Sequence, residues 1–258
     1  MSNGKSSLMV SFVLVVLGFS GCASLGTYNP ATGQREFIFV SAETEIAMGQ
    51  DLHKRLTDEF PLLEGQALDE RIRRIGQALA SISDRQDYAY RFFVIDKEDL
   101  NAFTTPGGYV YIYRGLAESL NDDDAIAAVL AHEVGHCAAR HIAKRFQAAL
   151  GYNLIGGIIF TQLGDQSQAW QIARMSTNAV TDLIFKAFSR QDEYQADALG
   201  IRYMYLAGYD VNGMMRAFEF LQEKSKGSQM PAYLRTHPYI EDRIAAVRRQ
   251  IKDIGQVL

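Results

Sequence analysis

The sequence predicts an α+β domain that is mostly α-helical, with a small β-sheet packed against a central helix. Apolar residues recur at helical spacing in several long segments, whereas only two short runs have the composition and alternation of strands. The chain has 258 residues, 48% hydrophobic and 22% charged, which is ordinary globular composition and enough for one sizeable core. The formal net charge of −4, without a basic block, argues against nucleic acid as a partner.

The first residues have the pattern of a secretory signal peptide. Lys5 precedes an apolar run at residues 8–19, which is too short to span a bilayer as a mature helix. Ser20 and Gly21 before Cys22 resemble a bacterial lipoprotein processing site, which implies cleavage before Cys22 and lipid on its sulfur and amino group. By the same analogy, the lack of a following aspartate favours an outer-membrane lipoprotein that faces the periplasm. The alternative is a plain signal peptide in which Cys22 is incidental.

We therefore expect three parts, which are a signal peptide at 1–21, a lipidated tether at 22–40 and one folded domain at 41–258. Turn-forming residues in the sequence "TYNPATGQ" are typical of a tether. Ser41 is expected to cap the first helix of the domain, because glutamates follow it in the first turn, and Pro61 is expected to end that helix.

A second helix and two strands follow in the prediction. The helix covers about 66–82, with apolar residues on one face and arginines on the other. The strands are "YRFFVID" at 90–96 and "GYVYIYRG" at 108–115, with a Pro-Gly-Gly turn signal between them. The second strand alternates, so that Val110 and Ile112 share one face and the other face carries Tyr109, Tyr111 and Tyr113.

The second half of the chain is predicted to be helical. A long helix opens at Asn121 in "NDDD", whose carboxylates suit the positive end of the helix dipole, and runs to about Phe146. Residues 151–180 are apolar but short, which fits a hairpin, a lid or a membrane contact better than a transmembrane helix. Further helices are expected at about 181–206, at 211–225 and after His237-Pro238.

The stretch "VLAHEVGHCAARH" at 129–141 carries three of the five histidines. His132 and His136 are four residues apart, so their imidazoles project from one helix face, as two nitrogen ligands of Zn²⁺ must. Glu133 lies at the edge of that face, where it can act as a general base without binding the metal, which completes the H-E-x-x-H pattern. The alternative is a chance match on a core helix, expected in about one of a hundred chains of this length.

The later sequence "EYQAD" supplies candidates for a third ligand. Glu193 and Asp197 are also four residues apart and share a face. Glu193 would complete a His₂Glu site with one open position, and Asp197 would accept the ring N–H of a ligand histidine. A solvated face is the alternative, but this helix also carries apolar residues, and unpaired buried carboxylates would be costly there.

Three further residues are interpreted as structural. His141 follows His136 by five residues, about 140° around a helix, so we expect it to form a hydrogen bond rather than join the same metal. Cys137 points away from the ligand face and is predicted to be a small buried hydrophobe. His53 lies on an early helix, far from any ligand pattern.

With these motifs the sequence resembles metallopeptidase family forty-eight, the family of the CAAX prenyl protease and the HtpX-type heat-shock membrane protease. It is most similar to the soluble periplasmic branch that includes the β-barrel assembly-enhancing protease. The resemblance implies a zincin-like (gluzincin) domain and extends over almost the whole mature chain. Its matching stretches are "NPATGQREFIFVSAETEIAMG" (29–49), "NAFTTPGGYVYIYRGL" (101–116), "AAVLAHEVGHCAARH" (127–141), "SRQDEYQADALG" (189–200) and "THPYIEDRI" (236–244).

The resemblance implies one Zn²⁺ per chain, held by His132, His136 and Glu193. It makes Glu133 the catalytic base and gives Asp197 the role of orienting a ligand histidine.

The resemblance also implies roles for later residues and for a strand. His237 would lie near the metal, either stabilising the transition state or occupying the open position in a resting form; the alternative is a helix N-cap. Arg243 would lie near the reacting carbonyl or be bonded to the site. A strand next to the active helix would offer its edge to an extended polypeptide, here through Tyr109, Val110 and Tyr111, unless this strand is simply core.

The expected function is a zinc-dependent endopeptidase that degrades misfolded or misassembled cell-envelope proteins, with outer-membrane proteins as substrates on family analogy alone. One alternative is a periplasmic chaperone or assembly factor with a latent, self-blocked zinc site. A second is a structural zinc domain, which predicts no open coordination position and unfolding on chelation.

Overall fold

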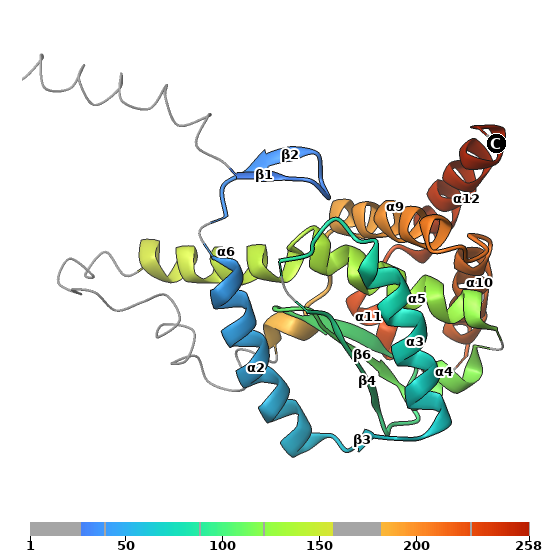
Figure 1. Ribbon diagram of the computed structural model, residues 1–258, viewed down its shortest axis with the longest axis horizontal. Helices are drawn as coiled ribbons and strands as arrows, with labels where there is room; N and C mark the ends of the chain where they lie inside the picture. The colour runs from blue at the N-terminus through green and yellow to red at the C-terminus, as the bar shows by residue number, and fades with distance from the viewer. Residues whose placement is uncertain are drawn as a thin grey trace, which may run out of the picture.

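The computed structural model describes residues 27–38, 40–87, 89–120, 122–156, 182–227 and 229–257. Helices surround a mixed β-sheet, and a separate two-stranded hairpin lies at the N-terminal end, so the predicted α+β class is confirmed (Figure 1). The expected signal peptide, Cys22 and most of 151–180 lie outside the described residues. No helix among the described residues is long and apolar enough to cross a bilayer.

The sheet has the strand order β3-β4-β6-β5. β4 and β6 pair in parallel, and the other two pairings are antiparallel. The two predicted strands are confirmed as β4 and β6, whereas β3 and β5 were not predicted because they are too short to show alternation. Their bounds are Leu62–Leu63 (β3), Arg91–Ile95 (β4), Ala102–Thr105 (β5) and Tyr109–Tyr113 (β6).

Each face of the sheet packs against helices. Val110 and Ile112 join the core formed with α3 (Ala67–Ser81) and α5 (Asp123–Ala138). The tyrosines of β6 join a second core with α2 (Ala42–Glu59) and α6 (His141–Gly156), so the predicted alternation is confirmed.

His53 belongs to the tyrosine side of the sheet, as its structural interpretation requires. Its Nδ1 lies 2.9 Å from the hydroxyl oxygen of Tyr111. Its ring also lies against Phe93, with 4.4 Å between the ring centroids.

The predicted long helix is in fact two helices, α5 and α6, separated at Arg140. Arg140 has a φ of 60°, the left-handed region that costs a non-glycine residue about 1–2 kcal/mol. Its Nε donates to the Glu45 carboxylate at 2.8 Å, and its guanidinium also donates to the carbonyl of Val40. Arg85 donates to the same Glu45 carboxylate through two bonds of 3.0 Å. Contacts with distant residues therefore stabilise the break between α5 and α6, which the apolar periodicity of the sequence does not reveal.

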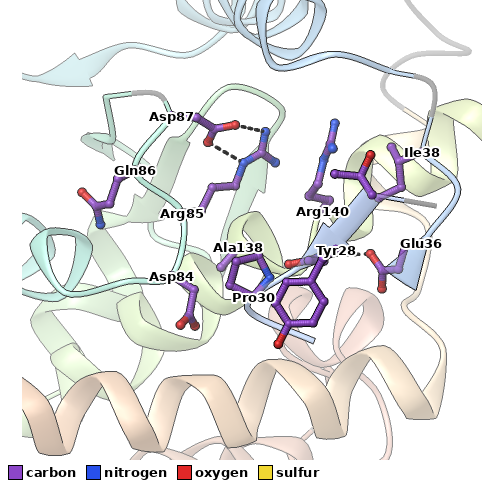
Figure 2. A pocket seen from close by; sticks show the side chains of 12 residues that line it. Tyr28, Pro30, Glu36, Ile38, Asp84, Arg85, Gln86, Asp87, Ala138 and Arg140 are labelled. Atoms are coloured by element: carbon purple, nitrogen blue, oxygen red, sulfur yellow. Dashed lines mark hydrogen bonds and ion pairs between the residues drawn. The ribbon is translucent and has the colours of Figure 1, made fainter. Parts of the chain in front are cut away.

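The break borders a pocket of about 260 Å³ beneath the N-terminal hairpin. Figure 2 shows Arg85 and Arg140 lining this pocket together with Tyr28 and Glu36 of the hairpin. The hairpin consists of β1 (Thr27–Asn29) and β2 (Gln34–Glu36), and Glu36 accepts a bond of 2.7 Å from Lys144. Part of the expected tether is thus folded against the domain, because ion pairing and turn residues fix it.

The C-terminal helices cover α5. α9 (Arg190–Leu206) lies along α5 in Figure 1, and α10 (Gly213–Ser225) packs against both α5 and α12 (Ile240–Val257). α9 begins with a capping box at Ser189, later than the predicted start at 181, and segment 182–189 precedes it. The short helices α4 (Arg114–Ser119) and α11 (Ala232–Thr236) were not predicted.

Candidate metal centre

The two motif helices approach each other closely where the sequence places Gly135, between the paired histidines. A Cβ atom at Gly135 would lie 2.8 Å from the carbonyl oxygen of Ala196 on α9, closer than packed atoms allow. Glycine at this position therefore permits α9 to bring Glu193 up to His132 and His136. All three of these side chains are buried.

The candidate ligand atoms form a compact cluster. The Nε2 atoms of His132 and His136 are 2.9 Å apart, and His136 Nε2 lies 3.4 Å from Glu193 Oε1. His237 joins them, with its Nδ1 3.2 Å from His132 Nε2 and 3.1 Å from Glu193 Oε1. Ligand atoms about 2.0–2.1 Å from a tetrahedral Zn²⁺ would be about 3.3 Å from one another, so the cluster fits this ion.

Buried polar atoms without partners support the same fit. Among the described residues, His237 Nε2 and both carboxylate oxygens of Glu133 are buried and make no hydrogen bond. Burial without a partner is costly for such atoms. A water or substrate bound beside the cluster would supply what these atoms lack.

Asp197 orients His132. Its Oδ1 lies 2.8 Å from His132 Nδ1, so this nitrogen donates to the carboxylate and Nε2 presents its lone pair to the cluster. This arrangement agrees with the position that the sequence predicted for Asp197, one turn further along α9 than Glu193.

His141 approaches the other histidine of the motif. Its Nδ1 lies 2.8 Å from Nδ1 of His136, and its Nε2 lies 2.9 Å from Oε1 of Gln195. The expectation that the helix turns His141 about 140° away from His136 is wrong, because the chain turns at Arg140. Its absence from the ligand cluster agrees with the prediction. Burial lowers the pKa of His141 to about 4.

Arg243 on α12 is bonded to the site from behind. It is 0% exposed and donates to Asp197 through Nε at 2.8 Å and Nη2 at 2.7 Å. It also forms an ion pair with Glu193 and donates to the carbonyl of His237 at 3.3 Å. Burial alone would raise the pKa of Glu193, but the charge of Arg243 holds that pKa well below its ordinary value. These contacts bond Arg243 to the site, as one of its two implied roles requires.

Glu133 lies beside the cluster and is 0% exposed. Burial raises the pKa of its carboxyl group above the ordinary value. Its Oε1 is 3.4 Å from Nε2 of His237. A carboxyl group that is held close to the cluster without a hydrogen bond is suited to exchange protons with a reacting molecule.

His237 is not the N-cap of the last helix, because α12 begins only at Ile240. It follows α11, where its backbone N–H donates to the carbonyl of Tyr233 at 2.8 Å and its ring stacks on the Tyr233 ring at 4.3 Å. The loop between α11 and α12 thus directs the imidazole into the cluster.

Phe188 is a site residue that the sequence did not indicate. Its ring stacks on His136 with 3.8 Å between centroids, and its backbone N–H donates to the carbonyl of Thr236 at 2.9 Å. The guanidinium of Arg145 lies 3.5 Å from the same ring. An isolated phenylalanine just before a helix gives no signal that would distinguish it from core.

The expectation that Tyr109, Val110 and Tyr111 offer a free strand edge is wrong. β6 is hydrogen-bonded to β4 on one side and to β5 on the other, and its residues are buried. β5 is one of the two terminal strands of the sheet, and Thr104 Oγ1 in β5 lies 2.7 Å from Sγ of Cys137 on α5. Cys137 is buried as predicted, and burial raises the pKa of its thiol to about 12.

Comparison with known proteins agrees with this geometry. The sequence profile described as peptidase family M48 matches residues 66–251. The chain is 29% identical to the "Beta-barrel assembly-enhancing protease" of Escherichia coli over 228 residues, 86% of this chain and 46% of that protein. It is 28% identical to the "Mitochondrial metalloendopeptidase OMA1" of Schizosaccharomyces pombe over 233 residues, 88% of this chain and 66% of that protein. The chain therefore spans about half the length of the assembly-enhancing proteases it matches.

Proposed function

The chain belongs to peptidase family M48, and from that premise we propose that it is a zinc-dependent endopeptidase. One observation carries this proposal, the convergence of His132, His136 and Glu193 beside the unpartnered carboxyl group of Glu133. A single Zn²⁺ would be held by the first three residues. When bound, zinc would act as a Lewis acid that polarises a peptide carbonyl and lowers the pKa of water.

Residues of the chain would provide proton transfer and would position the metal ligands. Glu133 would take the proton of the attacking water and pass it to the leaving amine, and a raised pKa suits a group that must do both near neutral pH. Asp197 would keep the Nε2 lone pair of His132 directed at the metal. Arg243 would hold Glu193 and Asp197 ionised and in place.

The substrate class we propose is unfolded or misassembled polypeptide. Since β6 is paired on both sides, an extended chain would have to add to a terminal strand, β3 or β5, and we favour β5 because it packs against α5. Pairing of this kind uses main-chain hydrogen bonds, so it favours extended segments over one particular sequence.

We further propose a location in the bacterial cell envelope, as an outer-membrane lipoprotein facing the periplasm. The signal-like N-terminus with Cys22 supports this, as does the similarity to a protease named for β-barrel assembly. Outer-membrane proteins in an unfolded or misassembled state would then be its substrates. Fatty-acid labelling of the wild type and of Cys22→Ala tests the anchor, and equal labelling of both proteins would contradict it.

The second candidate function is a chaperone or assembly factor with a latent site. It is favoured by the position of His237, whose Nδ1 lies as close to the other ligand atoms as a fourth ligand would. In that state the position that a substrate carbonyl needs is occupied by the chain itself.

Digestion of unfolded casein by zinc-loaded proteins separates the candidates. Glu133→Gln should retain zinc and lose activity by about 10²–10⁴-fold, the usual contribution of a general base. A gain of cleavage in His237→Ala would show a latent site. A wild type that binds casein but never cuts it would support the chaperone instead. Circular dichroism after chelation tests the structural zinc domain, which requires that the fold be lost.

A further inference from the structure

We propose that His141 and Gln195 form a relay that fixes the protonation of His136, so that its Nε2 is free to bind the metal. Both are positioning residues, since neither belongs to the cluster of ligand atoms. The inference rests on the proposed metal centre and extends it to two residues outside the ligand set, of which the sequence predicted only that His141 forms a hydrogen bond.

The donor and acceptor of each hydrogen bond can be assigned by starting from Gln195, whose amide oxygen has a fixed role. The Oε1 atom of Gln195 can only accept, so Nε2 of His141, at 2.9 Å, must carry the proton. A neutral imidazole has one donor and one acceptor nitrogen, so Nδ1 of His141 accepts. Its partner at 2.8 Å, Nδ1 of His136, is therefore the donor, and Nε2 of His136 is left with a lone pair.

The neighbours of His141 are consistent with a neutral ring. The side chain is 2% exposed, where an unpaired positive charge would be costly. The Oδ1 atom of Asp192 is 3.5 Å from His141 Nε2, a longer contact than that of Gln195 at 2.9 Å. The other oxygen of Asp192 accepts from the hydroxyl and backbone N–H of Ser189 in the helix cap.

The relay matches the arrangement at the other histidine. Asp197 accepts directly from Nδ1 of His132, and Gln195 acts on Nδ1 of His136 through His141. Both controlling side chains come from α9, from the residues directly before and after Ala196. The same helix that supplies the carboxylate ligand would therefore also set the tautomer of both imidazoles.

The turn at Arg140 is what makes the relay reachable. In a continuous helix His141 would project about 140° away from His136. The left-handed conformation of Arg140 instead turns the His141 side chain towards His136, and the Arg140 guanidinium donates to Glu45. The strained backbone between the two histidines thus allows the hydrogen bond between their rings to form.

Long-range ¹H–¹⁵N correlation of the histidine rings in the metal-free full chain reads the tautomers directly. We expect His136 to be protonated at Nδ1 and His141 at Nε2. The opposite assignment for His141 would overturn the relay. His53→Phe, a change at the sheet far from the cluster, serves as the control and also assigns one of the five histidine signals.

Zinc affinity, measured by competition with a chromogenic chelator, supplies a second readout. His141→Phe keeps the ring but not its nitrogens and should weaken zinc binding by about 10–100-fold, while the visible spectrum of the Co²⁺ form shifts. His141→Gln, which can accept from His136, should restore part of the affinity. Gln195→Leu should weaken binding, whereas Gln195→Glu, still an acceptor, should stay near wild type.

The outcomes separate the relay from the function on which it rests. A wild type that binds no zinc would refute the proposed metal centre. If the wild type binds zinc and His141→Phe binds it equally well with an unchanged Co²⁺ spectrum, the relay is wrong. If His141→Phe fails to fold, the variants of the half-buried Gln195 provide the test. Equal zinc affinity in Gln195→Leu and Gln195→Glu would overturn the proposal.

Discussion

Replacing Arg243 by methionine removes the buried cation that lies behind the metal site and keeps a similar side-chain length. In the wild type, two charge-assisted hydrogen bonds of 2.7 and 2.8 Å bind this guanidinium to Asp197, and an ion pair joins it to Glu193. In the variant, two buried carboxylates would face each other without a cation.

The size of the effect follows from this burial. Removing one partner of a buried ion pair costs about 3–5 kcal/mol, because the remaining charge is left uncompensated. For a domain of this size, each 1 kcal/mol lowers the melting temperature by about 2–4 °C, so we expect a decrease of about 6–20 °C. The decrease should be largest in metal-free protein, since bound zinc would itself compensate the charge of Glu193.

Thermal unfolding of the metal-free variant, followed by circular dichroism at neutral pH, measures this decrease. Arg190→Met is the matched control, because Arg190 also joins α9 to α12 through an ion pair, with Asp242, but both side chains are about half exposed. The control should melt close to the wild type. If Arg243→Met is as stable as the control, then buried pairing does not hold α12 against α9, and the assignment of a structural role to Arg243 fails.

Three further changes test other parts of the structure. Gly135→Val would place side-chain atoms within 2.8 Å of the Ala196 carbonyl, so overpacking should cost about 1–3 kcal/mol and weaken zinc binding; unchanged melting and affinity would contradict the close approach of α5 and α9. The Arg216 hydrogen bond lowers the pKa of Asp122, so their pairing stabilises the fold above the ordinary pKa near 4 and is lost as pH falls through the lower folded value. Arg216→Leu should therefore melt earlier than wild type at pH 7 and by a smaller margin at about pH 3, and an equal deficit at both pH values would refute this. Because the pKa of Cys137 is raised to about 12, iodoacetamide should alkylate it at pH 8 only in denaturant, which peptide mass analysis detects; rapid alkylation of the native protein would show that the thiol is accessible.

The pairing of functional side chains within each motif helix was predictable because it depends on local spacing. His132 and His136 share a helix face by their separation of four, and Glu193 and Asp197 do so for the same reason. The sequence did not show how far apart the two helices lie. Only the structure places Gly135 against Ala196 and so explains why the faces can meet.

Other features depend on contacts that no local pattern reveals. The break at Arg140 is stabilised by Glu45, 95 residues earlier, so the apolar periodicity of 121–146 predicted one helix. The strand β5 has four residues, all buried, and shows no alternation, which left β6 looking like an edge. Phe188 stacks on His136, and a single phenylalanine in the sequence does not indicate that its ring will contact a candidate ligand.

The ligand atoms come from parts of the chain that are synthesised at different times. His132 and His136 emerge from the ribosome well before Glu193, and Arg243, which holds the carboxylate in place, emerges later still. A nascent chain that has completed only α5 therefore has two imidazoles and no means to enclose the ion. The proposed hydrolytic capacity would arise only after the C-terminal helix has docked, and a partly folded molecule would lack the arrangement that cleavage requires.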